Sequence, residues 1–179
     1  LAEHYRAAVG KVPPHYHGIS RIAERSMGLG ATQGNAMTLL SDTNSIVEAM
    51  IADIESAQHS CLLAFYIIEP QGRIEELMSA VARAAERGVD CAVLADAVGS
   101  RSFFSGLWAQ TLRAAGVEVH ASLPVGILRT LFTRSDLRNH RKILVIDGKT
   151  GYTGSYNLVD PRYFKQDSGV GEWVDVMMR

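Results

Sequence analysis

The stretch that decides the fold reads HRKILVIDGKTGYTGSYN and covers residues 140–157. Its aliphatic run at 143–146 predicts a β-strand. Asp147 and Gly148 follow that run and form a dipeptide typical of the tight turn between two paired strands. The residues after the turn, TGYTGS at 150–155, provide the returning strand. We therefore expect a β-hairpin in this part of the chain.

The hairpin gathers polar side chains at its open end. Side chains two positions apart in a strand face the same way, so His140 and Lys142 project together. The returning strand brings Ser155 and Asn157 back beside them. Ammonium, hydroxyl and amide groups donate hydrogen bonds that suit phosphoryl oxygens, and an imidazole attacks or transfers a proton near neutral pH. The set predicts phosphodiester chemistry by way of a covalent phosphohistidine.

No cluster of carboxylates suitable for magnesium or zinc accompanies these residues in the sequence, so we expect neither a metal nor another cofactor. His15 and His17, near the start of the chain, also lack such partners. We interpret these two histidines as surface residues. The two cysteines, Cys61 and Cys91, both lie in apolar runs and predict buried free thiols.

Outward from the hairpin, apolar runs alternate with amphipathic segments. CLLAFYII at 61–68 and VDCAVLAD at 89–96 predict strands that are buried on both faces. Residues 44–58 and 73–88 carry apolar side chains at helical spacing. Weaker patterns predict strands at 37–42, 117–120 and 172–178 and a helix at 105–116. This alternation predicts an α/β fold, a mostly parallel mixed sheet with helices on both faces.

The sequence favours two regions of unequal regularity. Residues 1–36 are rich in glycine, proline and small polar residues, which predicts a lead-in or tail segment, whereas 37–179 form the regular lobe. The chain begins with Leu1 and stops at Arg179 inside a strand-like pattern. We therefore expect a truncated piece of a longer protein.

The charge and the apolar runs of the sequence limit the classes of partner and the membrane topology that we expect. The formal net charge is −1, so no global field attracts nucleic acid, and we expect no nucleic-acid partner. The longest apolar run, at 61–68, is far shorter than the roughly 20 residues of a spanning helix. We expect no transmembrane segment in this sequence.

The hairpin stretch resembles the phospholipase D superfamily, because it contains the complete signature HxK(x)4D(x)6GSxN. FYIIEPQGR, ADAVGSRSFF and the longer run RSDLRNHRK…YTGSYNLVDPRYFKQDSGVGEWVD are similar to the first catalytic half of bacterial cardiolipin synthases. This resemblance extends over residues 34–179. It implies a phospholipase D-like lobe.

The resemblance also implies roles for the motif residues. In this superfamily two such motifs share one site, where one histidine attacks phosphorus and the other protonates the leaving alcohol. His140 is then the expected nucleophile, Lys142 and Asn157 hold phosphoryl oxygens, and Ser155 assists.

Three further residues receive roles from the same resemblance. Asp147 and Gly154 are expected to be structural, with Asp147 fixing the turn. A carboxylate is expected to hold the second ring nitrogen of the nucleophilic histidine. We favour Asp175 over Glu172 for this role, and a structural salt bridge of Asp175 is the alternative.

The implied reaction moves a phosphatidyl group from one phosphatidylglycerol to the hydroxyl of another, giving cardiolipin and glycerol. The expected partners are anionic phospholipid and a second motif, because this sequence holds one motif. That second motif comes from the other lobe of the full-length chain or from a second copy in a homodimer. The full-length form is expected at the bacterial inner (cytoplasmic) membrane, and this piece is expected to be soluble.

The connection LPVGILRTLFTR before the motif is apolar and then basic. We expect Leu131 and Phe132 to enter the lipid interface, and Arg129 and Arg134 to meet anionic headgroups. Two other functions stay open at this point. One is a homodimeric single-motif nuclease of the same superfamily, and the other is a non-catalytic lobe that binds anionic lipid.

Overall fold

The computed structural model describes residues 12–123, 138–169 and 171–179. The chain divides into two units between Met37 and Thr38. The first unit contains the short 3-10 helix η1 (Pro14–Tyr16) and helix α2 (His17–Met27). The sequence pattern did not predict α2, and every one of its residues is at least partly exposed.

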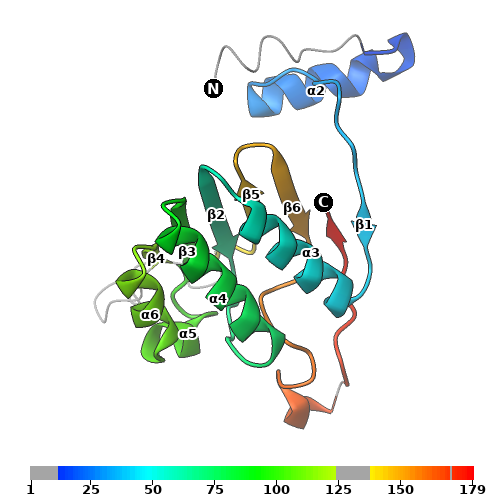
Figure 1. Ribbon diagram of the computed structural model, residues 1–179. Coiled ribbons are helices and arrows are strands. Elements are labelled where there is room, and N and C mark those ends of the chain that lie inside the picture. Colours follow the sequence, from blue (N-terminus) through cyan, green and yellow to red (C-terminus); the bar gives the residue numbers. More distant parts are fainter. Residues whose placement is uncertain (1–11, 124–137, 170) are drawn as a thin grey trace. The chain divides into compact units, whose positions relative to one another are not determined.

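The second unit is built on a sheet with the strand order β1-β7-β6-β5-β2-β3-β4 in the described residues (Figure 1). Its strands are β1 (Leu39–Leu40), β2 (Ser60–Phe65), β3 (Asp90–Asp96), β4 (Glu118–Ser122), β5 (Lys142–Ile146), β6 (Thr150–Gly154) and β7 (Met177–Met178). Its helices are α3 (Thr43–Ser56), α4 (Arg73–Glu86), α5 (Arg101–Ser105), α6 (Trp108–Ala114) and the 3-10 helix η2 (Gln166–Ser168).

The sheet is mixed, and its two kinds of pairing are segregated. β2, β3 and β4 are parallel because α4, and then α5 and α6, carry the chain back between them. The pairs β2–β5, β5–β6, β6–β7 and β7–β1 are antiparallel. The α/β class and the mixed sheet are therefore confirmed, but the expectation of a mostly parallel sheet is correct only for the β2–β3–β4 part.

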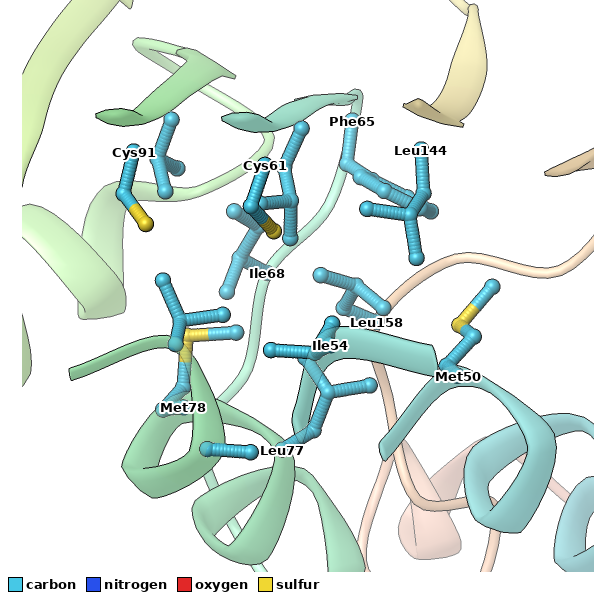
Figure 2. Packing of buried hydrophobic residues seen from close by; sticks show 14 of the residues in the cluster. Met50, Ile54, Cys61, Phe65, Ile68, Leu77, Met78, Cys91, Leu144 and Leu158 are labelled. Carbon is cyan, nitrogen blue, oxygen red and sulfur yellow. The ribbon is translucent and has the colours of Figure 1, made fainter. Parts of the chain in front are cut away.

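The helices cover one face of this sheet within the described residues. Cys61 and Phe65 of β2 point into the core, together with residues of α3 and α4 (Figure 2). Leu63 is buried with them, whereas Leu62 is 43% exposed. Leu94 of β3 is exposed in the same alternating way. In the described part of the lobe, the strands are therefore buried on one face and not on both. The helices cover that same face, whereas we had expected helices on both faces. An apolar run alone does not say which of its faces a helix will cover.

Two caps fix the helices that carry the core. Asp42 caps α3, since its Oδ1 accepts a hydrogen bond of 2.9 Å from the Ser45 N–H. The start of α4 is capped from far along the chain, because the Arg73 N–H donates to Oδ2 of buried Asp160 at 3.1 Å. Gly72 makes this possible, since a Cβ at its position would lie 2.3 Å from that oxygen. The segment after β6 is thereby tied to α4.

The last strand is shorter than the sequence pattern predicted. Residues 172–178 were expected to form a strand, but only Met177–Met178 do so. β6 ends at Gly154, so the residues before Met177 have little strand to pair with beyond the bond from the Ser155 N–H to the Val176 carbonyl.

The cysteines agree with their prediction, because both are buried free thiols in adjacent strands.

Candidate active site

The open end of the β5–β6 hairpin lies at the carboxyl end of β2. Phe65, the last residue of β2, pairs with Lys142, the first residue of β5. Ile143 pairs with Thr153, so the chain leaves β6 beside the start of β5. His140 therefore precedes this edge and Ser155 follows it. The register places the predicted site at one edge of the sheet.

His140 and Lys142 share a neighbour, Tyr66, which directly follows β2. The imidazole of His140 is exposed and packs on the Tyr66 ring, with a centroid distance of 4.2 Å and an interplanar angle of 43°. The Lys142 ammonium lies 5.8 Å from the same ring centroid and donates to the His140 carbonyl at 2.7 Å. Partial burial lowers the pKa of Lys142, while the charge of Asp175 acts in the opposite direction.

Asp175 is held by one of its two carboxylate oxygens. The Ser155 hydroxyl donates to Asp175 Oδ1 at 2.6 Å and accepts from the Val176 N–H at 3.1 Å. Asp175 Oδ2 is buried and has no hydrogen-bond partner among the described residues. A buried acceptor without a donor costs free energy, on the order of 1–3 kcal/mol. The site therefore contains a buried hydrogen-bond acceptor that can bind a further donor.

Asn157 is fixed by its carbonyl oxygen. Its side chain is nearly buried, and its Oδ1 accepts from the Ile67 N–H at 3.2 Å. The following residue, Leu158, bridges to Ile68 in parallel fashion, which ties this turn to the chain after β2. The amide NH₂ of Asn157 is left as the group that can donate to a phosphoryl oxygen.

The closed end of the hairpin has the opposite character. Asp147 accepts hydrogen bonds from the N–H groups of Gln58, His59 and Ser60, at 3.0, 2.8 and 2.8 Å. The hydrogen bond from Ser60, followed by those of Gln58 and His59, lowers the pKa of Asp147 to about 2. Its contacts tie the hairpin turn to the start of β2 and do not reach His140.

Gly154 belongs to the open end but offers no functional group. A Cβ at this position would lie 2.2 Å from the Val176 carbonyl oxygen and 2.9 Å from the Met177 Cα. Only glycine lets β7 approach β6 this closely, and that approach brings Asp175 beside Ser155. Its contacts are those of a structural residue.

Several neighbours of the site were not singled out by the sequence. Tyr66 lay inside a run interpreted only as a strand. Asp96, whose side chain is fully buried, pairs with Arg138 at 3.0 Å, two positions before His140. An aspartate at the end of a buried strand, followed by Ala-Val-Gly, was the signal that could have found this pair.

Three further expectations concern lipid contact, metal binding and membrane spanning. Arg129, Leu131, Phe132 and Arg134 lie outside the described residues. Within the described ranges, no three His, Cys, Asp or Glu side chains converge in the way a metal ion requires. In the same ranges, no helix combines the length and the apolar character needed to cross a bilayer.

Comparison with known sequences gives a family. A family model described as cardiolipin synthase, PLD-like domain, matches residues 50–169. A cardiolipin synthase A from Klebsiella pneumoniae subsp. pneumoniae is 43% identical over 166 residues, which are 93% of this chain and 34% of that protein. Another from Escherichia fergusonii is 44% identical over 159 residues, covering 89% and 33% respectively. The chain spans about one third of the length of these relatives.

Comparison with solved structures gives the fold. Nuc from Salmonella typhimurium, described as a phospholipase D family member, matches with a TM-score of 0.58 and 18% identity over 80% of each chain. NucT from Helicobacter pylori matches with a TM-score of 0.58 and 15% identity, over 80% of this chain and 83% of its own. At these identities the likeness concerns the fold alone, and it confirms the phospholipase D-like α/β lobe.

Proposed function

Because the chain belongs to the cardiolipin synthase family of phospholipase D-like domains, we propose that it supplies one half-site for phosphatidyl transfer. The reaction joins two phosphatidylglycerol molecules and gives cardiolipin and glycerol. The observation that carries this proposal is the grouping of His140, Lys142, Ser155 and Asn157 at one sheet edge, beside the unpartnered oxygen of Asp175.

The first half of the reaction forms a covalent intermediate. A ring nitrogen of His140 attacks phosphorus, and the bond from phosphorus to the oxygen of the headgroup glycerol breaks. A histidine of a second motif gives its proton to the departing oxygen, so glycerol leaves as an alcohol. Lys142 and the Asn157 amide bind the phosphoryl oxygens, whose charge they offset as the transition state forms.

The second half reverses these roles. The hydroxyl of a second phosphatidylglycerol attacks the phosphohistidine and gives its proton to the same second-motif histidine. The bond from phosphorus to His140 breaks, and cardiolipin is released. The second motif belongs to the other lobe of a longer chain or to a second copy, because this sequence contains one motif.

Asp175 orients the nucleophile in this scheme. Its Oδ2 has no donor among the described residues, and an imidazole N–H of His140 is a donor that the reaction would need to hold. When Oδ2 accepts that N–H, the other ring nitrogen presents its lone pair to phosphorus. Ser155 keeps the carboxylate in place through its bond to Oδ1. In the structure the His140 imidazole packs on Tyr66, and the hydrogen bond to Asp175 belongs to the proposed reactive state.

The test is transfer of label from lipid to protein. The protein is incubated with phosphatidylglycerol that carries ³²P in its phosphodiester, quenched in alkaline detergent and separated by electrophoresis. We expect label on the wild type and none on His140→Ala. His120→Ala is the matched control, because His120 is exposed on β4 and its ring forms a hydrogen bond with Glu118, away from the proposed site. Equal labelling of His140→Ala would remove His140 as the nucleophile.

The same samples separate the other two functions. Conversion of supercoiled plasmid to the nicked form without cardiolipin production would favour the single-motif nuclease. Binding to phosphatidylglycerol vesicles without label or product would favour a non-catalytic lipid-binding lobe. The near-neutral charge of the chain supports the lipid substrate over DNA.

A further inference from the structure

We infer that Tyr66 is a positioning residue for His140 and that the turn after β3 holds Tyr66 in this role. The inference rests on the proposed function of His140 as nucleophile. Tyr66 lies directly after β2, whose last residue pairs with the first residue of β5. Its ring contacts the imidazole of His140 and lies near the ammonium of Lys142. The Tyr66 ring thus contacts one of the two basic groups of the motif and lies near the other.

An aromatic face suits this task for a chemical reason. A nucleophilic imidazole needs one ring nitrogen free for phosphorus and the other free for a carboxylate. Tyr66 meets the His140 ring at a centroid distance of 4.2 Å and a tilt of 43°, within the range of favourable aromatic pairs. Such a contact restricts the orientation of the imidazole plane and leaves both ring nitrogens free to form bonds. No described residue forms a hydrogen bond with the His140 ring, so Tyr66 is the contact that orients it there.

Tyr66 is itself tightly held by the turn at 97–100. Buried Ser100 donates through its hydroxyl to the Tyr66 carbonyl at 3.0 Å and accepts from the Ile68 N–H at 3.0 Å. Gly99 lies directly against Tyr66, since a Cβ there would be 2.4 Å from the Tyr66 carbonyl oxygen and 3.0 Å from its ring. The turn therefore fixes both the backbone and the ring of Tyr66.

The same turn also holds the chain that leads into His140. Asp96 accepts from the N–H groups of Val98 and Gly99, both at 2.9 Å, which shapes the turn. The same Asp96 carboxylate accepts from Arg138 Nη1 at 3.0 and 3.1 Å. Arg138 is only 12% exposed, so this ion pair is largely shielded from water. One turn thus anchors the approach to His140 and the ring against which His140 packs.

The first test is spectroscopic and does not depend on catalysis. The protein is labelled with ¹⁵N, and the imidazole signals of His140 are assigned by their loss in His140→Asn. Tyr66→Phe keeps the aromatic face, so we expect wild-type shifts and tautomer ratio. Tyr66→Leu removes that face, so the ring-current shift of the His140 protons disappears and the tautomer ratio changes. An unchanged His140 spectrum in Tyr66→Leu would overturn the inference.

A second aromatic pair in the chain provides the matched control. Tyr16 and His15 have a similar geometry, with a centroid distance of 4.0 Å and an interplanar angle of 50°. Tyr16→Leu should move the signals of His15 and leave those of His140 unchanged. Gly99→Ala is the second variant, because it displaces Tyr66 without altering any atom of either ring. We expect it to change the His140 signals in the same direction as Tyr66→Leu.

The second test is kinetic. For phosphatidyl transfer we expect kcat of Tyr66→Leu to fall by about 10- to 100-fold with little change in KM, because misplacement of a nucleophile mainly affects the chemical step. Tyr66→Phe should restore the wild-type rate. Wild-type kcat in Tyr66→Leu would overturn the positioning role. A third outcome is that the spectra change as expected but the protein never takes up label on His140. That outcome would support the contact between Tyr66 and His140 and would reject the proposed phosphohistidine route.

Discussion

Two aspartates lie at opposite ends of the β5–β6 hairpin, Asp147 in its turn and Asp175 beside its open end, and they differ in how fully they are hydrogen-bonded. At the closed end, Asp147 accepts from three backbone N–H groups. At the open end, Asp175 accepts from the Ser155 hydroxyl and keeps a buried oxygen without a partner among the described residues. The carboxylate at the closed end uses both of its oxygens as hydrogen-bond acceptors, whereas the carboxylate at the open end has one oxygen that can still accept a hydrogen bond.

This contrast separates the parts of the motif by physical criteria. A carboxylate whose bonds are all made to backbone contributes to the fold and has little left to offer a substrate. A desolvated carboxylate oxygen without a donor costs stability and is kept where chemistry uses it. The hydrogen bonds therefore distinguish Asp147, which accepts from backbone N–H groups, from Asp175, which keeps an oxygen without a donor among the described residues, although the sequence alone shows both simply as aspartates. The predictions below test this division.

The largest effect is expected at the open end. Asp175→Asn keeps an oxygen for the Ser155 hydroxyl but replaces the unpartnered oxygen by an NH₂ that cannot accept from the imidazole. We expect the rate of His140 labelling to fall by about 10³- to 10⁴-fold, as when an orienting carboxylate becomes an amide in a catalytic triad. Thermal stability should change little, because the amide keeps the size of the carboxylate and carries no charge to desolvate.

Glu172→Gln is the matched control for this variant. Glu172 is the neighbouring acid that the sequence offered as the other candidate, and it is exposed. Its substitution should leave both the labelling rate and the melting temperature unchanged. If Asp175→Asn instead melted earlier and labelled at the wild-type rate per folded molecule, Asp175 would be a structural salt-bridge residue.

An intermediate effect is expected from the packing that brings the open end together. Gly154→Ala places a Cβ against the Val176 carbonyl, so β7 must move away from β6. We expect a loss of about 1–3 kcal/mol in the free energy of unfolding, as for other overpacked sites. Gly151→Ala, in the same strand, is the control, because a Cβ there meets no atom within 4 Å. Equal unfolding midpoints in urea for the two variants would show that β7 adapts without cost.

Local patterns in the sequence predicted the parts of this lobe that depend on local chemistry. The Asp147-Gly148 turn is one example, since both residues adopt positive φ, as a tight hairpin turn requires. The buried face of α4 is another, because Ile74, Leu77 and the apolar positions that follow them at helical spacing are all buried. In these cases the neighbours that matter lie within a few residues along the chain.

The parts that escaped prediction depend on contacts between distant segments. Tyr66 meets His140 only because β2 and β5 are adjacent in the sheet, and nothing in FYII distinguishes it from a core residue. Arg138 reaches Asp96 across 42 positions of sequence. The continuous apolar run of β2 also suggested burial on both faces, although Leu62 faces away from the core. Register and layer order are needed before such contacts can be inferred.

The smallest effect is expected at the closed end and depends on pH. The pKa of Asp147 is lowered to about 2 from the ordinary value of 3.8 by its backbone hydrogen bonds. A depressed native pKa stabilises the fold above the unfolded pKa, and this contribution is lost as pH falls through the native pKa. The melting temperature of Asp147→Asn should therefore lie a few degrees below wild type above pH ~4, and the difference should shrink between pH ~4 and pH ~2. Asp90→Asn, at an exposed position that starts β3, is the control and should follow wild type at every pH. A wild-type minus Asp147→Asn difference that stayed constant over this range would mean that the charge of Asp147 does not contribute, and that only the shape of its side chain holds the turn to β2.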